Sequence, residues 1–141
     1  MSIIIKSHSG KYSVKIIKKI NQKNLKKDNN FYIVDSSVYK IFLKKKLNKN
    51  FVLVNSSEKN KDYFEIGKIM NKIILFGIKR NSNLIAIGGG IIQDITGFIA
   101  SIIFRGINWT FYPTTLLAQG DSCIGGKTSV NFGIAKNQLG N

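Results

Sequence analysis

Residues 84–94 read Leu-Ile-Ala-Ile-Gly-Gly-Gly-Ile-Ile-Gln-Asp, an apolar run that leads into three consecutive glycines and a second apolar segment. A short apolar run that ends at glycine is typical of a buried strand, and the segment after the glycines predicts a helix. Glycine lets the main chain approach a ligand closely, and free amides at a helix start stabilise anions. We therefore expect a turn that faces a phosphate-bearing ligand. The alternative is that the glycines serve the turn geometry alone.

Similar apolar runs recur on both sides of this stretch. Strands are predicted at residues 3–5, 12–17, 31–34, 51–54, 84–87 and 109–112. One helix is predicted from a cap at Ser36 or Ser37 through Lys46, and its inward-facing residues would be Val38, Ile41, Phe42 and Leu47. A second helix is predicted from about Asp62 to Lys79, and its apolar residues at helical spacing are Tyr63, Ile66, Ile69, Met70, Ile73 and Ile74. Continuous apolar strands that alternate with helices predict an α/β fold, a mostly parallel sheet flanked by helices.

Polar or glycine residues follow three of the predicted strands. They are Asp35, residues 55–58 and residues 88–90. In parallel sheets, ligands bind beyond the carboxyl ends of the strands. The sequence therefore predicts a nucleotide site at that edge, with Asp94 in the first turn of the helix after the glycines, where a carboxylate suits a sugar hydroxyl.

The last third of the chain carries further candidate ligands. Thr114 and Thr115 follow Pro113 and would place two hydroxyls and free amides at a helix start. Arg105 has no acid within several residues, so a bound anion is a reasonable partner. Lys127, Lys136 and Asn137 are predicted to form a compact donor set in a glycine-containing loop region, which suits a substrate phosphate.

The run Gly125-Gly126-Lys127-Thr128 resembles the end of a Walker A loop. That motif requires a glycine at the position held by Asp121, where an acid would repel phosphate. A P-loop NTPase is therefore disfavoured.

The formal charge of +15 is unevenly distributed. Residues 1–80 hold 19 cations and 5 acids, whereas residues 81–141 hold 3 and 2. The cations are almost all lysines, and arginine, which reads guanine edges, occurs only at Arg80 and Arg105. Specific nucleic-acid binding is disfavoured, although a polyanion-binding basic protein with steep salt dependence remains an alternative.

A single cysteine, Cys123, excludes an intrachain disulfide and agrees with a reducing cytoplasm. With one histidine, His8, the chain alone cannot build a Cys/His zinc site, and Cys123 is interpreted as a packing residue. No export signal is apparent at the N-terminus. Residues 84–104 are apolar, but Gln93 and Asp94 at their middle argue against a membrane span.

Three blocks, GGGIIQDITGFIASIIFRG at 88–106, PTTLLAQGDSCIGGKTSVN at 113–131 and KNQLG at 136–140, together resemble the signature blocks of 3-dehydroquinate synthase and its sugar phosphate cyclase relatives. The resemblance runs from about residue 31 to the end. It implies a Rossmann-like NAD-binding domain of the dehydroquinate synthase-like fold. The implied NAD contacts are Asp35, Glu58, Lys61, Gly89, Gly90, Ile91, Asp94, Thr114, Thr115, Leu117, Asp121, Ser122, Lys127, Lys136 and Asn137. The implied substrate contacts are Arg105, Asp121, Lys127 and Asn137, of which Arg105, Lys127 and Asn137 are the catalytic candidates.

The resemblance also implies a reaction, that of a carbon–oxygen lyase of the shikimate pathway. NAD oxidises a hydroxyl of a phosphorylated seven-carbon sugar acid, phosphate is eliminated, the hydride returns, the ring opens and an aldol step closes the carbocycle. Family members use a divalent metal, zinc or cobalt, held by a glutamate and two histidines in a helical second domain, and Arg105 would reach across a homodimer. Gln93 replaces a glycine common in the family.

We expect residues 1–141 to form one NAD-binding domain that lacks the helical metal-binding domain, an N-terminal fragment inactive alone. The alternatives are a related sugar phosphate cyclase of secondary or polysaccharide metabolism and a free-standing nucleotide-binding module.

Overall fold

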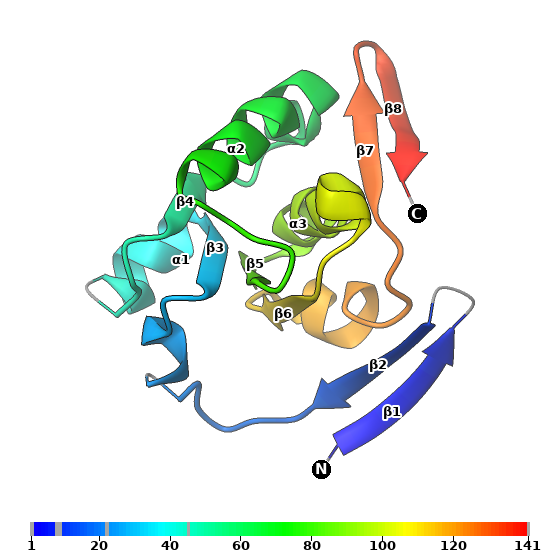
Figure 1. The fold of residues 1–141 in the computed structure, drawn as a ribbon. Helices are drawn as coiled ribbons and strands as arrows, with labels where there is room; N and C mark the ends of the chain where they lie inside the picture. Colours follow the sequence, from blue (N-terminus) through cyan, green and yellow to red (C-terminus); the bar gives the residue numbers. More distant parts are fainter. Residues whose placement is uncertain (1, 8–9, 22, 45, 141) are drawn as a thin grey trace.

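The computed structural model of the chain describes residues 2–7, 10–21, 23–44 and 46–140. At its centre is a four-stranded parallel sheet in the order β4-β3-β5-β6 (Figure 1), made of β3 (Asn30–Asp35), β4 (Phe51–Val54), β5 (Asn83–Gly88) and β6 (Trp109–Pro113). Asp35 lies opposite Val54, and Gly88 lies opposite Pro113, so the carboxyl ends of all four strands meet at one edge.

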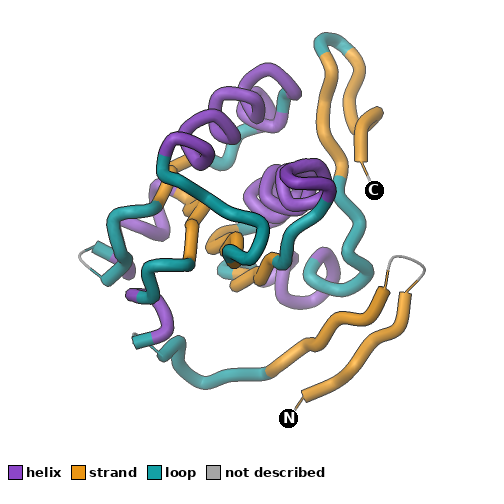
Figure 2. The backbone as a smooth tube through the Cα atoms, in the orientation of Figure 1, coloured by secondary structure: helices purple, strands orange, loops and turns teal. Residues whose placement is uncertain are grey.

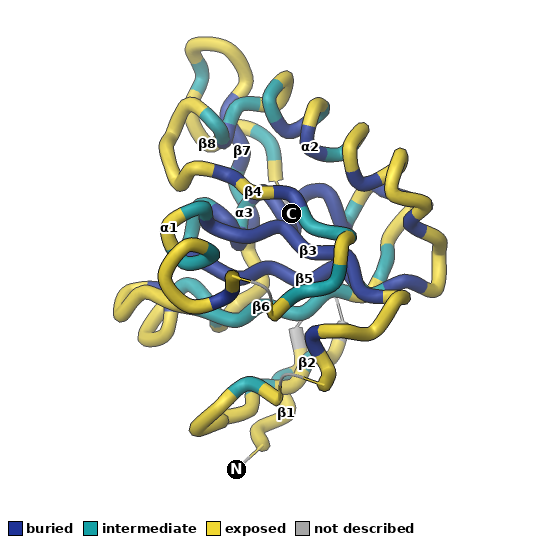
Figure 3. The backbone as a smooth tube through the Cα atoms, turned by 90° about the vertical axis from the view of Figure 1, so that its left-hand side faces the viewer, coloured by how far each residue is buried: buried dark blue, intermediate teal, exposed yellow. Residues whose placement is uncertain are grey.

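Helices cover both faces of the sheet, as the continuous apolar runs predict. On one face, α2 (Tyr63–Leu75) and α3 (Gly90–Ile102) bury side chains such as Ile66 and Ile95 against Ile33 and Ala86. On the other face, η1 (Asn24–Lys26), α1 (Ser36–Val38) and the π-helical η2 (Tyr39–Leu43) cover Tyr32, Val34, Ile85 and Ile87 with Leu25 and Leu43. Strands β3 and β5 at the centre of the sheet and helix α3 are accordingly the most buried elements, whereas β6 is half-buried (Figure 3). The predicted α/β class and parallel sheet are confirmed.

The helix after β3 differs from its prediction in its cap, its end and its inner face. Asp35 caps it, not a serine, because the Asp35 carboxylate accepts the amides of Ser37 and Val38. The helix ends at Leu43, and its π-helical turns change the angular step per residue. Leu43 therefore faces the sheet, whereas Ile41 and Phe42, which were predicted to face inward, are 70% and 61% exposed.

Helix α2 starts where it was predicted and ends earlier. The Asp62 carboxylate caps it by accepting the Phe64 amide at 3.0 Å. It stops at Leu75, four residues before the predicted end, and Gly77 follows with φ +84°. Ile66, Ile69 and Ile73 are buried as predicted, but Tyr63 and Ile74 are exposed.

Two antiparallel hairpins flank the central layers (Figure 2). The first consists of β1 (Ser2–Ser7) and β2 (Gly10–Lys15), so both N-terminal strands exist as predicted, but the second ends before Ile16 and Ile17. This hairpin contacts the rest of the chain through the Tyr12 hydroxyl, which accepts the Gly125 amide at 2.7 Å. The second, β7 (Ser129–Phe132) with β8 (Ala135–Gly140), lies beside α2 and α3, where a loop was expected.

Three short helical turns complete the described chain: η3 (Glu58–Lys61), η4 (Ile103–Arg105) and the π-helical η5 (Ala118–Ser122). None of the helices in the described ranges is both long and apolar enough to cross a bilayer.

Candidate functional site

An open cleft of about 430 Å³ lies at the carboxyl edge of the parallel sheet. Residues at or just beyond the carboxyl end of each of the four strands line it. The lining consists of Asp35, Ser37, Val38, Ser56, Gly89, Gly90, Ile91, Thr114 and Thr115. Six of these residues, Asp35, Gly89, Gly90, Ile91, Thr114 and Thr115, are predicted NAD contacts, so the structure brings them together. Their binding of a ligand stays a prediction.

Glycine at the start of α3 keeps the base of the cleft open. Gly89 caps the helix without a side chain, and the first helical hydrogen bond runs from the Gln93 amide to the Gly89 carbonyl at 3.1 Å. The amides of Gly90 and Ile91 precede that bond and are available to an anion. A Cβ at Gly89 would lie 3.1 Å from Thr115 Cγ2, so a side chain there would narrow the cleft.

Asp35 is held firmly at the β3 side of the cleft. Ser56 Oγ donates to Asp35 Oδ2, and the amides of Ser37 and Val38 donate to Oδ1 at 2.7 and 3.1 Å. Burial by itself would raise the pKa of the Asp35 carboxyl, but these hydrogen bonds outweigh it and lower the pKa below its ordinary value. Asp35 therefore presents a fixed negative charge beside the α3 amides.

Thr114 and Thr115 differ from their prediction in one respect. The Thr114 amide is not free, because it donates to the Gly88 carbonyl at 2.8 Å and so extends the pairing of β6 with β5. Thr115 Oγ1 accepts the Ala118 amide at 3.2 Å and caps the turn that follows. The side chains of both residues remain exposed at the cleft.

A second group of predicted residues is joined by the β7–β8 hairpin. Lys61 Nζ lies 2.8 Å from Asp94 Oδ2, and Asp94 Oδ1 accepts the Ser129 amide at 3.2 Å. Ser129 Oγ donates to Asn137 Oδ1 at 2.9 Å. These contacts place three of the predicted residues, Lys61, Asp94 and Asn137, in one hydrogen-bonded network.

Asn131 extends that network to Glu58. Its Nδ2 donates to Glu58 Oε2 at 3.0 Å, and its Oδ1 accepts the Asn137 amide at 2.9 Å. Sequence reasoning missed both hairpin residues, Ser129 and Asn131. A sequence pattern for this hairpin was present, because polar and apolar side chains alternate over residues 129–132 and a glycine follows, as is typical of a strand that leads into a turn. In the structure Gly133 adopts φ +59° at that turn.

The position predicted for Asp94 is wrong by one turn. Helix α3 starts at Gly90, its first turn holds no acid, and Asp94 lies on the next turn. Its carboxylate therefore meets Lys61 and the hairpin rather than the helix amides.

The predicted residues after β6 lie on a separate segment. Leu117 is 74% exposed, Asp121 is exposed at the end of η5, and the Ser122 carbonyl accepts Gln93 Nε2. Lys127 is exposed in the loop before β7. Gly126 and Lys127 lead into a strand and not a helix, so this run does not form a Walker A loop, in agreement with the prediction from its spacing.

Lys136 and Asn137 lie on strand β8, not in a loop as predicted. Lys136 is exposed, and in the described part of the chain neither its side chain nor that of Lys127 forms an ion pair. The predicted compact donor set is therefore spread over the loop before β7 and strand β8.

Arg105 lies at the opposite edge of the sheet from the cleft. It ends η4, immediately after α3, and the 13 residues of that helix separate it from Gly90 by about 20 Å. Its side chain is exposed, and both Phe104 and Arg105 have positive φ, 51° and 64°. Within one chain Arg105 does not join the cleft, and its role across a dimer stays a prediction.

The described residues contain no cluster of three or more His, Cys, Asp or Glu side chains that could hold a metal ion. The donors present do not fit a resident zinc or cobalt.

Comparison with known proteins gives a consistent picture. The family model described as 3-dehydroquinate synthase N-terminal matches residues 51–141. The 3-dehydroquinate synthase of Thermodesulfovibrio yellowstonii is 53% identical over 89 residues, which are 63% of this chain and 25% of that protein. The enzyme of the same name from Buchnera aphidicola subsp. Cinara cedri is 45% identical over 126 residues, 82% of this chain and 34% of that protein. The chain thus spans a quarter to a third of the length of these relatives.

Two solved structures share the fold. One is 2-deoxy-scyllo-inosose synthase complexed with carbaglucose-6-phosphate, NAD+ and Co2+, with a TM-score of 0.72 and 26% identity over 86% of this chain and 35% of that chain. The other is 2-epi-5-epi-valiolone synthase from Streptomyces hygroscopicus subsp. jinggangensis 5008 with NAD+ and Zn2+ bound, with a TM-score of 0.71 and 30% identity over 79% of this chain and 34% of that chain.

Proposed function

The chain belongs to the 3-dehydroquinate synthase family, and we propose that it is the NAD-binding N-terminal part of such an enzyme. The observation that carries this proposal is the cleft into which all four parallel strands deliver small, hydroxyl or acidic residues. Ligands of such sheets bind at that edge. Both solved relatives described above hold NAD+, which supports the same cofactor here.

The residues of the cleft fit a dinucleotide diphosphate. Gly89 leaves room for phosphate against the chain, and the amides of Gly90 and Ile91 point to the same place from the start of α3. The hydroxyls of Thr114 and Thr115 add donors from the β6 side. We propose that Asp94, whose charge Lys61 balances, retains lone pairs for a ribose hydroxyl.

The proposed reaction is the cyclisation of a phosphorylated heptulosonate with loss of phosphate. When bound, NAD would supply the transient oxidation of a substrate hydroxyl. In this chain, Asn137 is held in place by Ser129 and Asn131, while Lys127 offers an exposed cation near the start of the same hairpin. We propose that these two residues bind the substrate and its phosphate, and that Arg105 serves a site on a second copy of the full-length enzyme.

Sequence identity favours 3-dehydroquinate synthase over the other cyclases. The curated relatives described above, at 53% and 45% identity, carry that name, whereas the two solved cyclases with other products are 30% and 26% identical. A related sugar phosphate cyclase is therefore the second choice.

Titration of the purified chain with NAD tests the cofactor assignment. We expect saturable binding by calorimetry, and we expect Gly89→Ala to weaken it about tenfold or more because its Cβ would meet Thr115 at the phosphate position. Gly67→Ala is the matched control, since a Cβ at Gly67 meets nothing within 4 Å. An absence of NAD binding, or equal affinities for both variants, would refute the proposed site.

Phosphate release tests the dependence on groups outside the chain. Because the described residues offer no metal cluster, we expect the 141-residue chain to release no phosphate from the heptulosonate substrate when NAD and zinc or cobalt are added. The measurement is a colorimetric phosphate assay, with a full-length family member as positive control. Measurable release would show that these residues suffice for elimination.

A further inference from the structure

A glutamine is buried between helix α3 and the segment that follows β6. Gln93 is 2% exposed, and its Nε2 donates to the Ser122 carbonyl at 2.5 Å. The bond joins residues 29 apart in sequence and ties the first turn of α3 to the end of η5. Nothing in the proposed chemistry of the cleft uses Gln93 directly.

The face of α3 that carries Gln93 is the surface on which residues 118–128 pack. Gly90, Gln93 and Gly97 lie on one face of α3, at positions i, i+3 and i+7. A Cβ at Gly90 would lie 3.7 Å from Ser122 Oγ, and a Cβ at Gly97 would collide with Thr128 Cγ2. Small residues on α3 thus let Ser122 and Thr128 approach the helix closely, and Gln93 adds a hydrogen bond to the Ser122 carbonyl.

Several buried polar atoms at this contact between α3 and residues 118–128 have no hydrogen-bond partner in the part of the chain that the structure describes. Gln93 Oε1, Ser122 Oγ and Thr128 Oγ1 are buried and have no hydrogen-bond partner among the described residues. Buried polar atoms without partners are unfavourable, and a methionine would fill the same volume without that cost. The hydrogen bond to Ser122 is therefore the feature of Gln93 that an apolar side chain could not replace.

We propose that Gln93 is a positioning residue that fixes residues 118–128 on α3 in the conformation that binds NAD. This inference rests on the proposed function, because the segment carries Asp121, Ser122 and Lys127, which are predicted cofactor and substrate contacts. Thr115, at the cleft, caps the same segment through the Ala118 amide. Release of the Ser122 carbonyl would let the segment move while α3 and the sheet stay in place.

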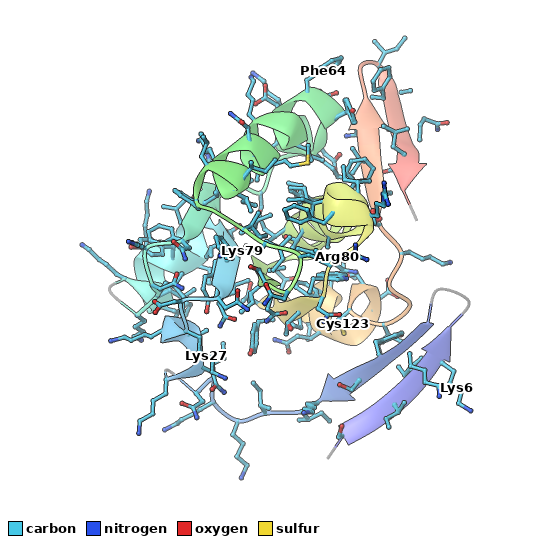
Figure 4. The ribbon with its side chains drawn as sticks, viewed as in Figure 1. Lys6, Lys27, Phe64, Lys79, Arg80 and Cys123 are labelled. Atoms are coloured by element: carbon cyan, nitrogen blue, oxygen red, sulfur yellow. The ribbon has the colours of Figure 1, made fainter. Side chains whose placement is uncertain are left out.

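Cys123 provides a reporter that does not depend on NAD. It is the only cysteine, it directly follows η5 (Figure 4), and its thiol donates to the Gln119 carbonyl at 3.3 Å. We expect Gln93→Met to raise the rate of Cys123 modification by an aromatic disulfide reagent about fivefold or more, because loss of one hydrogen bond shifts local opening by that order.

Thr96→Val is the matched control. It removes a buried side-chain hydrogen bond of the same helix, from Thr96 Oγ1 to the Ile92 carbonyl at 2.7 Å. Both partners of that bond belong to α3, so its loss does not remove a hydrogen bond to residues 118–128. We expect it to lower the thermal midpoint without raising the Cys123 rate beyond about twofold. If Gln93→Met does not fold cooperatively, Gln93→Asn, whose amide is one methylene too short to reach Ser122, takes its place.

The two readouts separate this inference from the proposed function. Faster Cys123 modification together with an NAD affinity reduced about fivefold or more in the Gln93 variant supports the proposal. An unchanged Cys123 rate overturns it, and so does a faster rate with unchanged NAD affinity. If the wild-type chain binds no NAD, the cofactor assignment fails, and the Cys123 rates still decide whether Gln93 holds the segment.

Discussion

The two ends of helix α3 differ in what surrounds them. At the amino end, Gly89 and Gly90 lie in a cleft to which all four parallel strands contribute, and Asp94 is paired with Lys61 one turn later. At the carboxyl end, Arg105 is exposed, adopts φ +64° and forms no ion pair within the described residues. The proposed cofactor half of the site is thus assembled by this chain alone, whereas the arginine expected to meet the substrate lies about 20 Å away.

The largest effect is expected from breaking the ion pair at the amino end. Lys61→Met would leave Asp94 with no cation at a position where the two side chains are 8% and 19% exposed, so we expect the free energy of unfolding to fall by about 3 kcal/mol. Urea denaturation followed through the single tryptophan, Trp109, measures it. Lys68→Met, which removes an exposed pair with Glu65, should cost less than about 0.5 kcal/mol. Equal losses of stability in the two variants would contradict the claim that the Lys61–Asp94 pair near the amino end of α3 stabilises the chain more than an exposed pair does.

A smaller effect is expected from the carboxylate beside the cleft. Asp35→Ala removes the cap of α1 and the Ser56 partner, and we expect it to cost about 1–2 kcal/mol near neutral pH. Because the pKa of Asp35 is lower in the folded chain than its ordinary value of 3.8, its contribution is complete above that value and disappears as the pH falls through the folded pKa.

Denaturation curves of both proteins at several pH values check this sign. The stability difference between wild type and Asp35→Ala should shrink in acid, whereas Asp28→Ala, at an exposed aspartate, should show no comparable difference at any pH. A gap that persisted at about pH 2 would show that the ionised carboxylate is not its source.

The smallest effect, of opposite sign, is expected at the carboxyl end. Arg105→Gly places the residue that tolerates positive φ at the strained position, and we expect stability to rise by up to about 1 kcal/mol with NAD affinity unchanged. Thermal unfolding and NAD titration of the same sample measure both. A loss of stability would show that Arg105 has a structural partner in this chain, and the contrast between the two ends would fail.

Local sequence patterns were sufficient for the central layers. Strand β5 ends at Gly88 and helix α3 begins at Gly90, as the sequence predicts, because a buried strand and a glycine turn can each be recognised from a few adjacent residues. The parallel order of the strands follows from the same alternation with helices.

The network around Asp94 could not be predicted in this way. Asn131 and Glu58 are 73 residues apart, and Ser129 and Asp94 are 35 apart, so their hydrogen bonds depend on how the hairpin packs on α2 and α3. The helix after β3 was mispredicted for a related reason. Its π-helical turns, which bring Leu43 to the sheet, break the 3.6-residue period on which the prediction relied.

The central position of β3 has a consequence for the order of folding. It pairs with β4 on one side and with β5 on the other, and its pairing with β5 joins Asn30 to Asn83 across a separation of 53 residues. For such distant strands to pair, the chain must first lose the conformational entropy of the long loop between them, and this slows folding. A nascent chain therefore cannot pair both edges of β3 until β5 has left the ribosome, and until then β4 is the only strand of the described four-stranded sheet that can pair with β3.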